Sequence, residues 1–507
     1  MLANIHKNQG EYSQIGKTGV TFCPVIRYYG IELFFREVKT MKIRFLEPGN
    51  LPYRRSFKNL YVYDKYIRTP SNGIITLATV LKRDYPDVLC YSESISKPVF
   101  DDIYSADIVF ISIFTFSANR GYELADMIRA NSGAVIVFGG LHATLNYSEA
   151  AEHCDYVIRG EGDEILPLFV KEIEQGRVPR LPGVVYKKDG ETVSCGEPVP
   201  PTALDIVPDR NLMYNFRKMV WHNTIWPQVH ASRGCPHNCD YCALVAAFGR
   251  KVRTRSPENV VEDIKAAVEF FGHRMLNILW LTDDNFFADR EWAVKTLNAI
   301  IGSGIRYSFT IQARYEVGFD DEMLELLKKA GFDEIAMGIE FLDDESFENY
   351  HKKSSYSEIL RSVKNIQAHG IRTRGLFIFG ADDHVPGIGK RLADFVIGNN
   401  ISGVLIQSMY FIPGTPVYET HKDKLIDNGD WSRCVGKTVH YPKNMTPAQL
   451  QREVITASRL IYSRKRLLEA IFRKRGTERI LFIGEYFWQK EVRRDLKKEL
   501  KYLESLS

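Results

Sequence analysis

Residues 228–242 read QVHASRGCPHNCDYC, a predicted strand that runs directly into a loop with three cysteines. These are Cys235, Cys239 and Cys242, and chance would give such a cluster on the order of once in several hundred chains. Three thiolates can bind a four-iron cluster, which takes one thiolate per iron, and leave one iron open to a reactant. A structural zinc site is the alternative, but its fourth ligand would be His237, inside the loop itself. The loop therefore predicts a reactive iron–sulfur site.

The loop follows the first strand of a repeat in which short apolar strands alternate with helical stretches such as 320–330 and 357–369. This alternation is typical of a parallel α/β sheet. Six units are too few for an eight-fold barrel, so we expect a partial (βα)6 barrel of the TIM type with its site at the carboxyl ends of the strands. The predicted strands are Gln228–Ser232, Asn277–Thr282, Tyr307–Ala313, Glu334–Ile339, Arg374–Phe379 and Gly403–Tyr410.

An earlier strand and helix alternation, from Met41 to about Lys171, predicts a doubly wound, Rossmann-like parallel sheet. Its predicted strands are Lys42–Leu46, Val88–Ser92, Ile108–Ile113, Val135–Phe138 and Tyr156–Arg159, and its predicted helices are Gly73–Lys82, Asn119–Arg129 and Ser148–His153. Polar or glycine-rich loops precede the first helix or follow the strands, at Thr69–Gly73, Ser112–Ser117, Gly139–Thr144 and Gly160–Gly162. Since such sheets bind ligands at the carboxyl ends of their strands, these loops are candidate ligand contacts. Each loop taken alone is more often a plain turn.

The predicted fold class is therefore α/β, in five segments. They are an N-terminal extension (1–40), the Rossmann-like domain (41–180), a proline-rich linker with a hairpin (181–219), the partial barrel (220–425) and a helical C-terminal cap (426–507). The extension has no clean period, so Met41 is an alternative start to Met1.

The composition excludes several classes of protein. The chain is 45% hydrophobic and 26% charged, close to the globular average. No stretch approaches the roughly 18 apolar residues of a membrane span, and no signal-peptide pattern opens the chain. Five of the eight cysteines are scattered singly, which favours a reducing compartment over a disulfide framework. We therefore expect a cytoplasmic protein.

The positive charge is concentrated in the tail. Residues 464–507 hold 13 Lys and Arg against 7 Asp and Glu, although the whole chain has a net charge of +4. A nearly neutral body argues against a nucleic-acid enzyme. The favoured interpretation of this basic tail is a solvated helical face with its four large aromatic residues buried. The alternative is peripheral contact with anionic lipid or an acidic partner. The four aromatic residues are Phe472, Phe482, Phe487 and Trp488.

The C-x3-C-x2-C loop after the first strand of a partial barrel resembles the radical S-adenosylmethionine (SAM) superfamily. The resemblance implies that the three cysteines ligate a [4Fe–4S] cluster, that SAM chelates the open iron, and that one electron cleaves SAM to methionine and a 5′-deoxyadenosyl radical. It also implies a small-molecule or lipid substrate and a reductant such as flavodoxin or ferredoxin. Tyr241 would shield the cluster.

Polar or glycine residues end the later barrel strands, where this family binds SAM. The resemblance implies that Asp284 and Asn285 bind the methionyl amino group, Arg314 the SAM carboxylate and Glu340 the ribose, and that Gly380 lies beside adenine. Each residue alone is also compatible with an ordinary surface ion pair or turn.

The first domain resembles the B12-binding domain that precedes the barrel in one radical SAM branch, and the resemblance covers residues 41–420. It implies cobalamin contacts in the loops of that domain. Those residues are Pro70, Ser71, Asn72, Gly73, Ser112, Thr115, Gly139, Gly140, His142, Thr144, Glu161 and Gly162. No Asp-x-His-x-x-Gly motif is present, so we expect cobalamin without a protein histidine on cobalt, with His142 contacting the cofactor rather than the metal. A degenerate domain that has lost the cofactor is the alternative.

Three functions follow from these resemblances. The first is cobalamin-dependent methylation of an unactivated carbon. The second is a radical SAM cyclisation or oxidation without methyl transfer, and the third is a non-catalytic iron–sulfur or cobalamin-binding module. Methylthiotransferases carry a second cysteine cluster, and the spread of Cys23, Cys90, Cys154 and Cys195 disfavours that branch.

Overall fold

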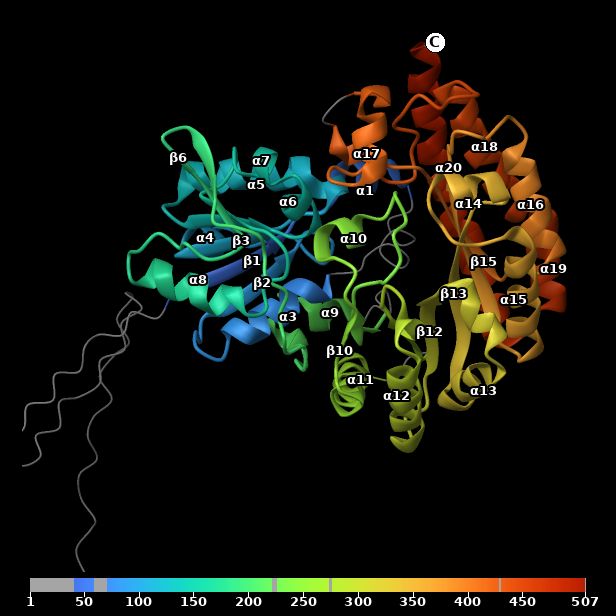
Figure 1. The fold of residues 1–507 in the computed structure, drawn as a ribbon, viewed down its shortest axis with the longest axis horizontal. Coiled ribbons are helices and arrows are strands. Elements are labelled where there is room, and N and C mark those ends of the chain that lie inside the picture. The colour runs from blue at the N-terminus through green and yellow to red at the C-terminus, as the bar shows by residue number, and fades with distance from the viewer. Residues whose placement is uncertain (1–40, 59–70, 221–225, 273–275, 428–429, 507) are drawn as a thin grey trace, which may run out of the picture.

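A mixed sheet and a parallel sheet lie side by side in the computed structural model (Figure 1), which describes residues 41–58, 71–220, 226–272, 276–427 and 430–506. The predicted extension 1–40 lies outside the described residues. Met41, the alternative start, is the first residue that the structure describes. Both sheets belong to α/β units, as the alternation of strands and helices predicts.

The first sheet has seven strands in the order β2-β1-β3-β4-β5-β6-β7. The first five strands pair in parallel. β1 therefore lies between β2 and β3, and the chain changes direction across the sheet at this point. The strands are β1 (Ile43–Glu47), β2 (Val88–Ser92), β3 (Ile108–Ser112), β4 (Val135–Gly139), β5 (Tyr156–Ile158), β6 (Val184–Lys188) and β7 (Glu191–Ser194).

Helices cover both faces of this sheet, which makes it doubly wound. The side chains of α3 and α8 share one apolar core with Phe45 and Phe110, and those of α5 share another with Val109 and Phe138. The helices of this part are α1 (Leu51–Ser56), α3 (Asn72–Leu81), α4 (Phe100–Tyr104), α5 (Ala118–Asn131), α6 (Leu141–Leu145), α7 (Tyr147–Ala150), α8 (Ile165–Glu174) and α9 (Phe216–Val220).

The hairpin predicted in the linker 181–219 is confirmed as β6–β7. It also pairs antiparallel with β5 and so continues the first sheet past residue 180, because Val184 and Val185 are buried in the cores of that sheet. The stretch 139–144, expected as a loop, enters the short helix α6, since Gly140 turns the chain with a φ of +91°.

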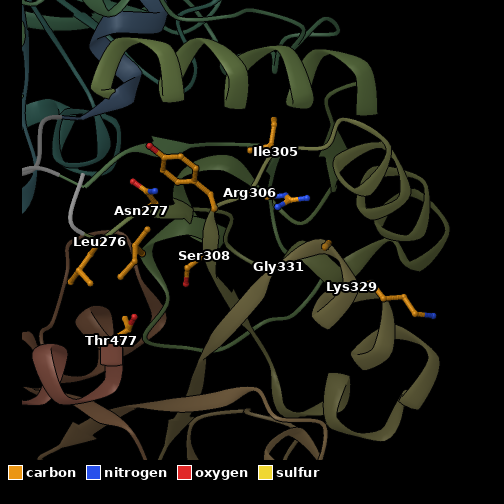
Figure 2. Close-up of a pocket in the computed structure, with 11 residues that line it drawn as sticks. Leu276, Asn277, Ile305, Arg306, Ser308, Lys329, Gly331 and Thr477 are labelled. Carbon is orange, nitrogen blue, oxygen red and sulfur yellow. The ribbon is translucent and has the colours of Figure 1, made fainter. Parts of the chain in front are cut away.

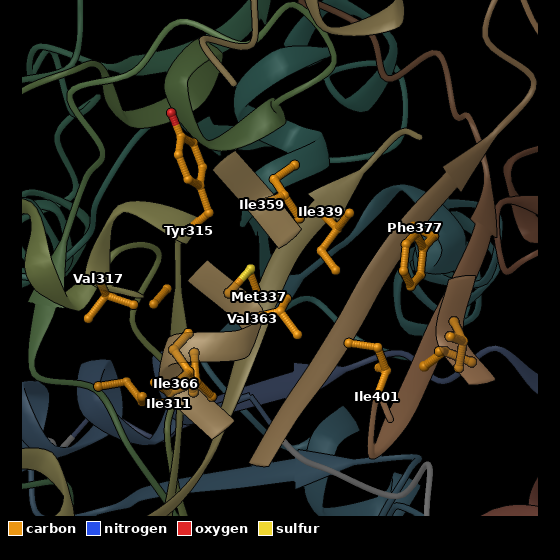
Figure 3. Packing of buried hydrophobic residues seen from close by; sticks show 14 of the residues in the cluster. Ile311, Tyr315, Val317, Met337, Ile339, Ile359, Val363, Ile366, Phe377 and Ile401 are labelled. Atoms are coloured by element: carbon orange, nitrogen blue, oxygen red, sulfur yellow. The ribbon is translucent and has the colours of Figure 1, made fainter. Parts of the chain in front are cut away.

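The second sheet has six parallel strands in the order β15-β14-β13-β12-β11-β8, the partial barrel. Alternate residues face the outer helices. In Figure 3, Met337, Ile339 and Phe377 point into the same apolar cluster as Ile359 and Val363 of α15. The strands are β8 (Gln228–Val229), β11 (Ile278–Leu281), β12 (Ser308–Ala313), β13 (Phe332–Glu340), β14 (Arg372–Phe379) and β15 (Gly403–Ser408).

The first barrel strand is shorter than the expected 228–232. Its ladder stops at Val229 because an Asp283 carboxylate oxygen accepts the backbone N–H groups of Ala231 and Ser232. Ser232 instead starts β9 (Ser232–Arg233), which pairs antiparallel with β10 (Arg253–Thr254).

The remaining helices surround the barrel and form the C-terminal cap. None of the helices in the described ranges is both long and apolar enough to cross a bilayer. They are α10 (Ala243–Phe248), α11 (Pro257–Phe271), α12 (Arg290–Gly302), α13 (Asp321–Ala330), α14 (Asp344–Asn349), α15 (Tyr356–Ala368), α16 (Ile388–Gly398), α17 (Pro416–His421), α18 (Pro447–Ile461), α19 (Arg464–Arg473) and α20 (Gly476–Ser505).

The longest helix, α20, closes the inner face of the barrel sheet. Glu485 of α20 is buried and pairs with Arg374 of β14, which also bonds to Glu334 of β13 at 2.8 Å. The Tyr462 hydroxyl donates to the other Glu485 oxygen at 2.7 Å. Because a buried charge needs a partner, α20 is part of the barrel core and not an appendage.

Candidate functional site

The three-cysteine loop is anchored to the barrel on several sides. The Asp240 backbone N–H donates to the Tyr350 carbonyl at 3.3 Å, and its own carbonyl accepts from Val417 N–H at 3.2 Å. Gly234 opens the loop with a φ of +91°, and a Cβ there would lie 2.4 Å from the Lys251 carbonyl oxygen. The loop therefore requires glycine at that position.

The environment of the thiols suits a metal cluster. Cys235, Cys239 and Cys242 are free and half-buried. Burial raises the pKa of the Cys235 and Cys242 thiols, and the neighbouring thiols raise it further. Thiolates in such a place need a positive charge beside them, which a metal cluster supplies. Tyr241 packs edge-on against Phe341, with 5.9 Å between the ring centroids, behind the loop.

Two aspartates after β11 meet the beginning of the cysteine loop. Asp283 is fully buried and accepts from the Ser232 hydroxyl at 2.6 Å, and burial raises the pKa of its carboxyl group to about 7. Asp284 accepts the Gly234 backbone N–H at 3.2 Å. Asn285, the third residue predicted here, is also buried. The turn after β11 thus lies against the cysteine loop, and Asp283 accepts the backbone N–H groups of Ala231 and Ser232 at the start of that loop.

Charged groups gather at the ends of β12 and β13. Arg314 donates a hydrogen bond to Glu316 at 3.0 Å. Its positive charge lowers the pKa of the Cys235 thiol, against the larger effect of burial. Glu340 has a φ of +68° at an irregularity of the β13 ladder, a strained conformation typical of functional sites. Lys352, which sequence reasoning missed, is buried and lies 3.4 Å from Glu340.

Lys352 has no strong sequence signal, because a lysine between two helices is usually a solvated surface residue. Its ammonium group donates to the Gly338 carbonyl at 2.7 Å, and burial lowers its pKa. The negative charges of Glu340 and of a Cys239 thiolate raise the pKa of Lys352 in part against this effect of burial. Lys352 therefore adds a cation beside the cysteine loop.

Gly380 ends β14 under the C-terminal cap. Its φ is +97°, and a Cβ there would lie 2.7 Å from the His440 ring. His440 bonds to the Gly380 carbonyl at 3.2 Å, and the Gly380 N–H donates to His384 Nδ1, also at 3.2 Å. The cap thus reaches the carboxyl end of this strand through His440.

The first domain has a narrow slot of about 50 Å³ at the carboxyl ends of its central strands, next to the point where strand order reverses. Its lining includes Ser112, Gly139, Gly140 and Gly162. Glycines leave the backbone open to a bulky ligand, and this is the position at which doubly wound sheets bind ligands. The position of the slot and its open backbone therefore suit contact with part of the tail of a buried nucleotide-bearing cofactor, whereas a volume of about 50 Å³ does not hold the whole tail.

His142 does not line this slot, and its predicted contact with the cofactor stays a prediction. It is fully buried, with Nδ1 3.3 Å from the Thr115 hydroxyl and Nε2 3.2 Å from the Tyr122 hydroxyl. The Glu149 carboxylate lies 3.5 Å from the same Nε2. His142 and Thr115 therefore belong to an internal polar network behind the loop, because a buried imidazole must satisfy both ring nitrogens.

The other residues predicted to contact cobalamin make hydrogen bonds to the protein or lie outside the described part of the chain. Pro70 lies outside the described residues. Ser71 caps α3 through a hydrogen bond to Gly73 N–H at 3.2 Å, and Asn72 donates to the Gln228 carbonyl of the barrel at 3.2 Å. Thr144 accepts from Gly160 N–H at 2.9 Å. Asn72 thus joins the two domains, a contact that a single-domain sequence pattern does not reveal.

Glu47, at the end of β1, is a buried carboxyl group that sequence reasoning also missed. It accepts from Ser71 N–H at 2.9 Å and from the Ser92 hydroxyl at 2.6 Å. Burial raises its pKa to about 7 from an ordinary value of 4.5. Between these values the folded protein holds a proton that the unfolded chain has lost.

The free energy of unfolding should therefore fall as pH rises from about 4.5 to 7. The Glu47→Gln variant should lose the part of this dependence that Glu47 contributes, whereas Asp283, whose pKa is also raised to about 7, keeps its own part. The variant should gain about 3 kcal/mol over the parent at pH 8. Unfolding midpoints of both proteins between pH 5 and 8 test this. Parallel pH curves for the two would contradict it.

Glu161 connects the two domains instead of lying open to a cofactor. It accepts from Arg233 at 2.6 Å and also pairs with Arg253, and Arg233 reaches Asp163 at 2.7 Å. Both acidic side chains are buried, and both arginines belong to the short ladder that begins the cysteine loop. The Gly-Glu-Gly loop therefore holds the cysteine loop in place.

Replacement of Glu161 by glutamine should lower the free energy of unfolding by about 3 kcal/mol, because the largely buried Arg253 guanidinium loses its carboxylate partner and Arg233 keeps only Asp163. Cobalamin bound per chain should stay unchanged. Thermal unfolding and cobalamin absorbance measure the two quantities. Loss of cobalamin at an unchanged melting temperature would assign Glu161 to the cofactor instead.

The loop edges of both sheets face each other. Helix α6, after the Gly139–Gly140 turn, packs against α10, which follows Cys242 (Figure 1). Trp431 of the cap donates to Glu149 at 2.9 Å. The helix that follows the glycine turn and the helix that follows the cysteine loop thus meet between the domains.

A separate cavity of about 430 Å³ lies at the amino-terminal edge of the barrel sheet, at the opposite ends of β11 and β12 (Figure 2). Ile278 and Ser308, the first residues of these strands, line it together with Arg306, Lys329 and Thr477. It takes no part in the site around the cysteine loop.

Comparison with known proteins agrees with this arrangement. Residues 229–385 match the radical SAM superfamily and residues 69–170 match the B12 binding domain. The chain is 26% identical over 412 residues to bacteriochlorophyllide d C-12(1)-methyltransferase of Chlorobaculum tepidum, across 80% of this chain and 86% of that one.

Two further similarities bear on fold and reaction. The chain is 26% identical over 373 residues to the anaerobic magnesium-protoporphyrin IX monomethyl ester cyclase of Cereibacter sphaeroides, across 69% of this chain and 59% of that one. The structure of the radical SAM methyltransferase TsrM from Kitasatospora setae, with cobalamin and a [4Fe–4S] cluster, superposes with a TM-score of 0.64 at 14% identity, over 90% of this chain and 99% of that one.

The fold and the cysteine site thus define a radical SAM enzyme. The chain belongs to the radical SAM proteins that carry a B12 binding domain before the barrel. Its cofactors are a [4Fe–4S] cluster, SAM and cobalamin. The free thiols fit the cluster, and the glycine-lined slot suits contact with part of the cobalamin tail.

Proposed function

We propose that this enzyme is a cobalamin-dependent methyltransferase that methylates an unactivated carbon of a small molecule. The observation that supports the proposal is the packing of α6, which follows the glycine turn, against α10, which follows the cysteine loop. When bound, the cluster supplies the electron that cleaves SAM, and cobalamin carries the methyl group. Methyl transfer to carbon requires both sites to open to one substrate, and proximity of this kind is a large part of catalysis.

The chain's own residues position these groups. Cys235, Cys239 and Cys242 would bind the cluster, and Asp283 fixes the start of their loop through Ser232. We propose that SAM lies along the charged ends of β12 and β13, where the cations of Arg314 and Lys352 offer partners for its carboxylate and Glu340 offers an acceptor for its ribose hydroxyls. Charged partners of this kind orient a zwitterionic ligand in a buried site.

The similarity to a cyclase supports a second candidate, radical chemistry without methyl transfer. The two differ in their SAM products. The full-length protein, reconstituted anaerobically with iron, sulfide and cobalamin, is given SAM labelled with ¹³C in the methyl group, a reductant such as flavodoxin, and small-molecule extract from the source cell.

We expect S-adenosylhomocysteine together with 5′-deoxyadenosine, and a product heavier by one labelled methyl group. 5′-Deoxyadenosine without S-adenosylhomocysteine would instead support cyclisation or oxidation. The matched control is the same protein without cobalamin, which should make no S-adenosylhomocysteine.

A further inference from the structure

Helix α19 turns an apolar ridge outward. Three side chains form this ridge: Leu468 is 56% exposed, Ile471 37% and Phe472 81%. Residues three and four apart share one helix face, so the three lie together. The favoured interpretation from sequence, in which the tail aromatic residues are buried, is therefore wrong for Phe472 and Phe487, although Phe482 is buried.

The opposite face of the same helix is the one that holds it to the protein. Ala470 is 1% exposed, Leu467 packs against the barrel core, and Arg466 lies over the Phe482 ring at 5.4 Å. The Arg466 guanidinium also donates to the Ile461 carbonyl at 2.9 Å. Because this face fixes α19 in place, the ridge is held toward solvent and is not a frayed segment.

The ridge lies in a strongly basic part of the chain. Residues 464–479 contain seven Lys and Arg against two Glu, and one of these, Glu478, pairs with Lys474. Arg464, Lys465 and Arg473 are exposed. We call these three the ridge cations. An apolar strip between exposed cations is the pattern of helices that lie in a membrane interface.

We propose that α19 docks this protein on a bilayer surface that contains anionic lipid, with Phe472 and Leu468 inserted between head groups and the ridge cations at phosphate level. This inference is independent of the proposed function. A second copy of the chain fits the ridge less well, because a two-fold contact places like patches together and would oppose the ridge cations of both copies. Lipid phosphates complement them instead.

The experiment is flotation of the full-length holoprotein with two kinds of vesicle, phosphatidylcholine alone and an equal mixture of phosphatidylglycerol and phosphatidylcholine. One variant carries Leu468→Ser and Phe472→Ser, and another carries Arg464→Gln, Lys465→Gln and Arg473→Gln. Leu168→Ser is the matched control, since Leu168 is 54% exposed on α8 of the other domain. Iron and cobalamin contents verify that each variant is folded.

We expect the parent and the control to float with the anionic vesicles but not with phosphatidylcholine alone. Each ridge variant should weaken partitioning at least about tenfold. Raising salt from 0.1 to 0.5 M should weaken binding of the parent, because screening acts on the cations. A parent that does not float, or ridge variants that float equally well, would overturn the proposal. So would a ridge variant whose mass in light scattering halves, since the ridge would then be an interface between copies.

Discussion

A Cys239→Ala variant should retain almost no iron, against about four iron atoms per reconstituted parent chain, and should form no 5′-deoxyadenosine from SAM. The loop offers three thiols and is fixed by Gly234 and by the backbone bonds of Asp240, so it has no freedom to recruit another ligand. Iron and sulfide analysis, absorbance near 400 nm and product chromatography measure the effect.

The control for this variant is Cys195→Ala, because Cys195 is free and partly exposed but lies at the hairpin of the first sheet. It should keep full iron content and full SAM cleavage. Normal iron content in the Cys239 variant, or an equal loss in the control, would remove the cysteine loop as the cluster site.

A Gly139→Leu variant should lose cobalamin while it keeps its iron. A Cβ at Gly139 would have no neighbour closer than 3.8 Å, so the fold accepts a side chain there, but a leucine would fill the slot of about 50 Å³. We expect cobalamin binding to weaken at least about a hundredfold, since overlap with a close-packed ligand costs several kcal/mol. Cobalamin absorbance after gel filtration reports the result.

Gly133→Leu is the matched control, because a Cβ at that glycine meets nothing within 4 Å and the residue lies just before the same strand. It should bind cobalamin like the parent. Retention of cobalamin by the Gly139 variant would mean that the cofactor tail does not enter the slot.

The strand pattern was the most predictable part of the molecule. Val88–Ser92 has identical bounds in sequence and structure, because a short apolar run between polar turns buries itself on both faces of a parallel sheet. The six-stranded barrel is confirmed for the same reason. The predicted end of the first barrel strand at Ser232 is wrong, because the Asp283 carboxylate, distant in sequence, accepts the backbone N–H of Ser232.

Side-chain roles were less predictable when partners come from another part of the chain. Glu161 follows a strand like a ligand contact, yet its partners are arginines of the barrel. His142 follows a glycine turn, yet Tyr122 and Glu149 surround it. Lys352 and Glu47 carry no motif at all, and burial alone makes them chemically distinctive.

The contact between α20 and the barrel also constrains the order in which the chain acquires its structure on the ribosome. The last barrel strand ends at Ser408, but Arg374 gains its second carboxylate only once Glu485 has been synthesised. Until then the nascent barrel has an uncovered inner face, which is the state in which chaperones engage a polypeptide. Completion of the barrel is therefore a late event in biogenesis, whereas the first domain can assemble long before.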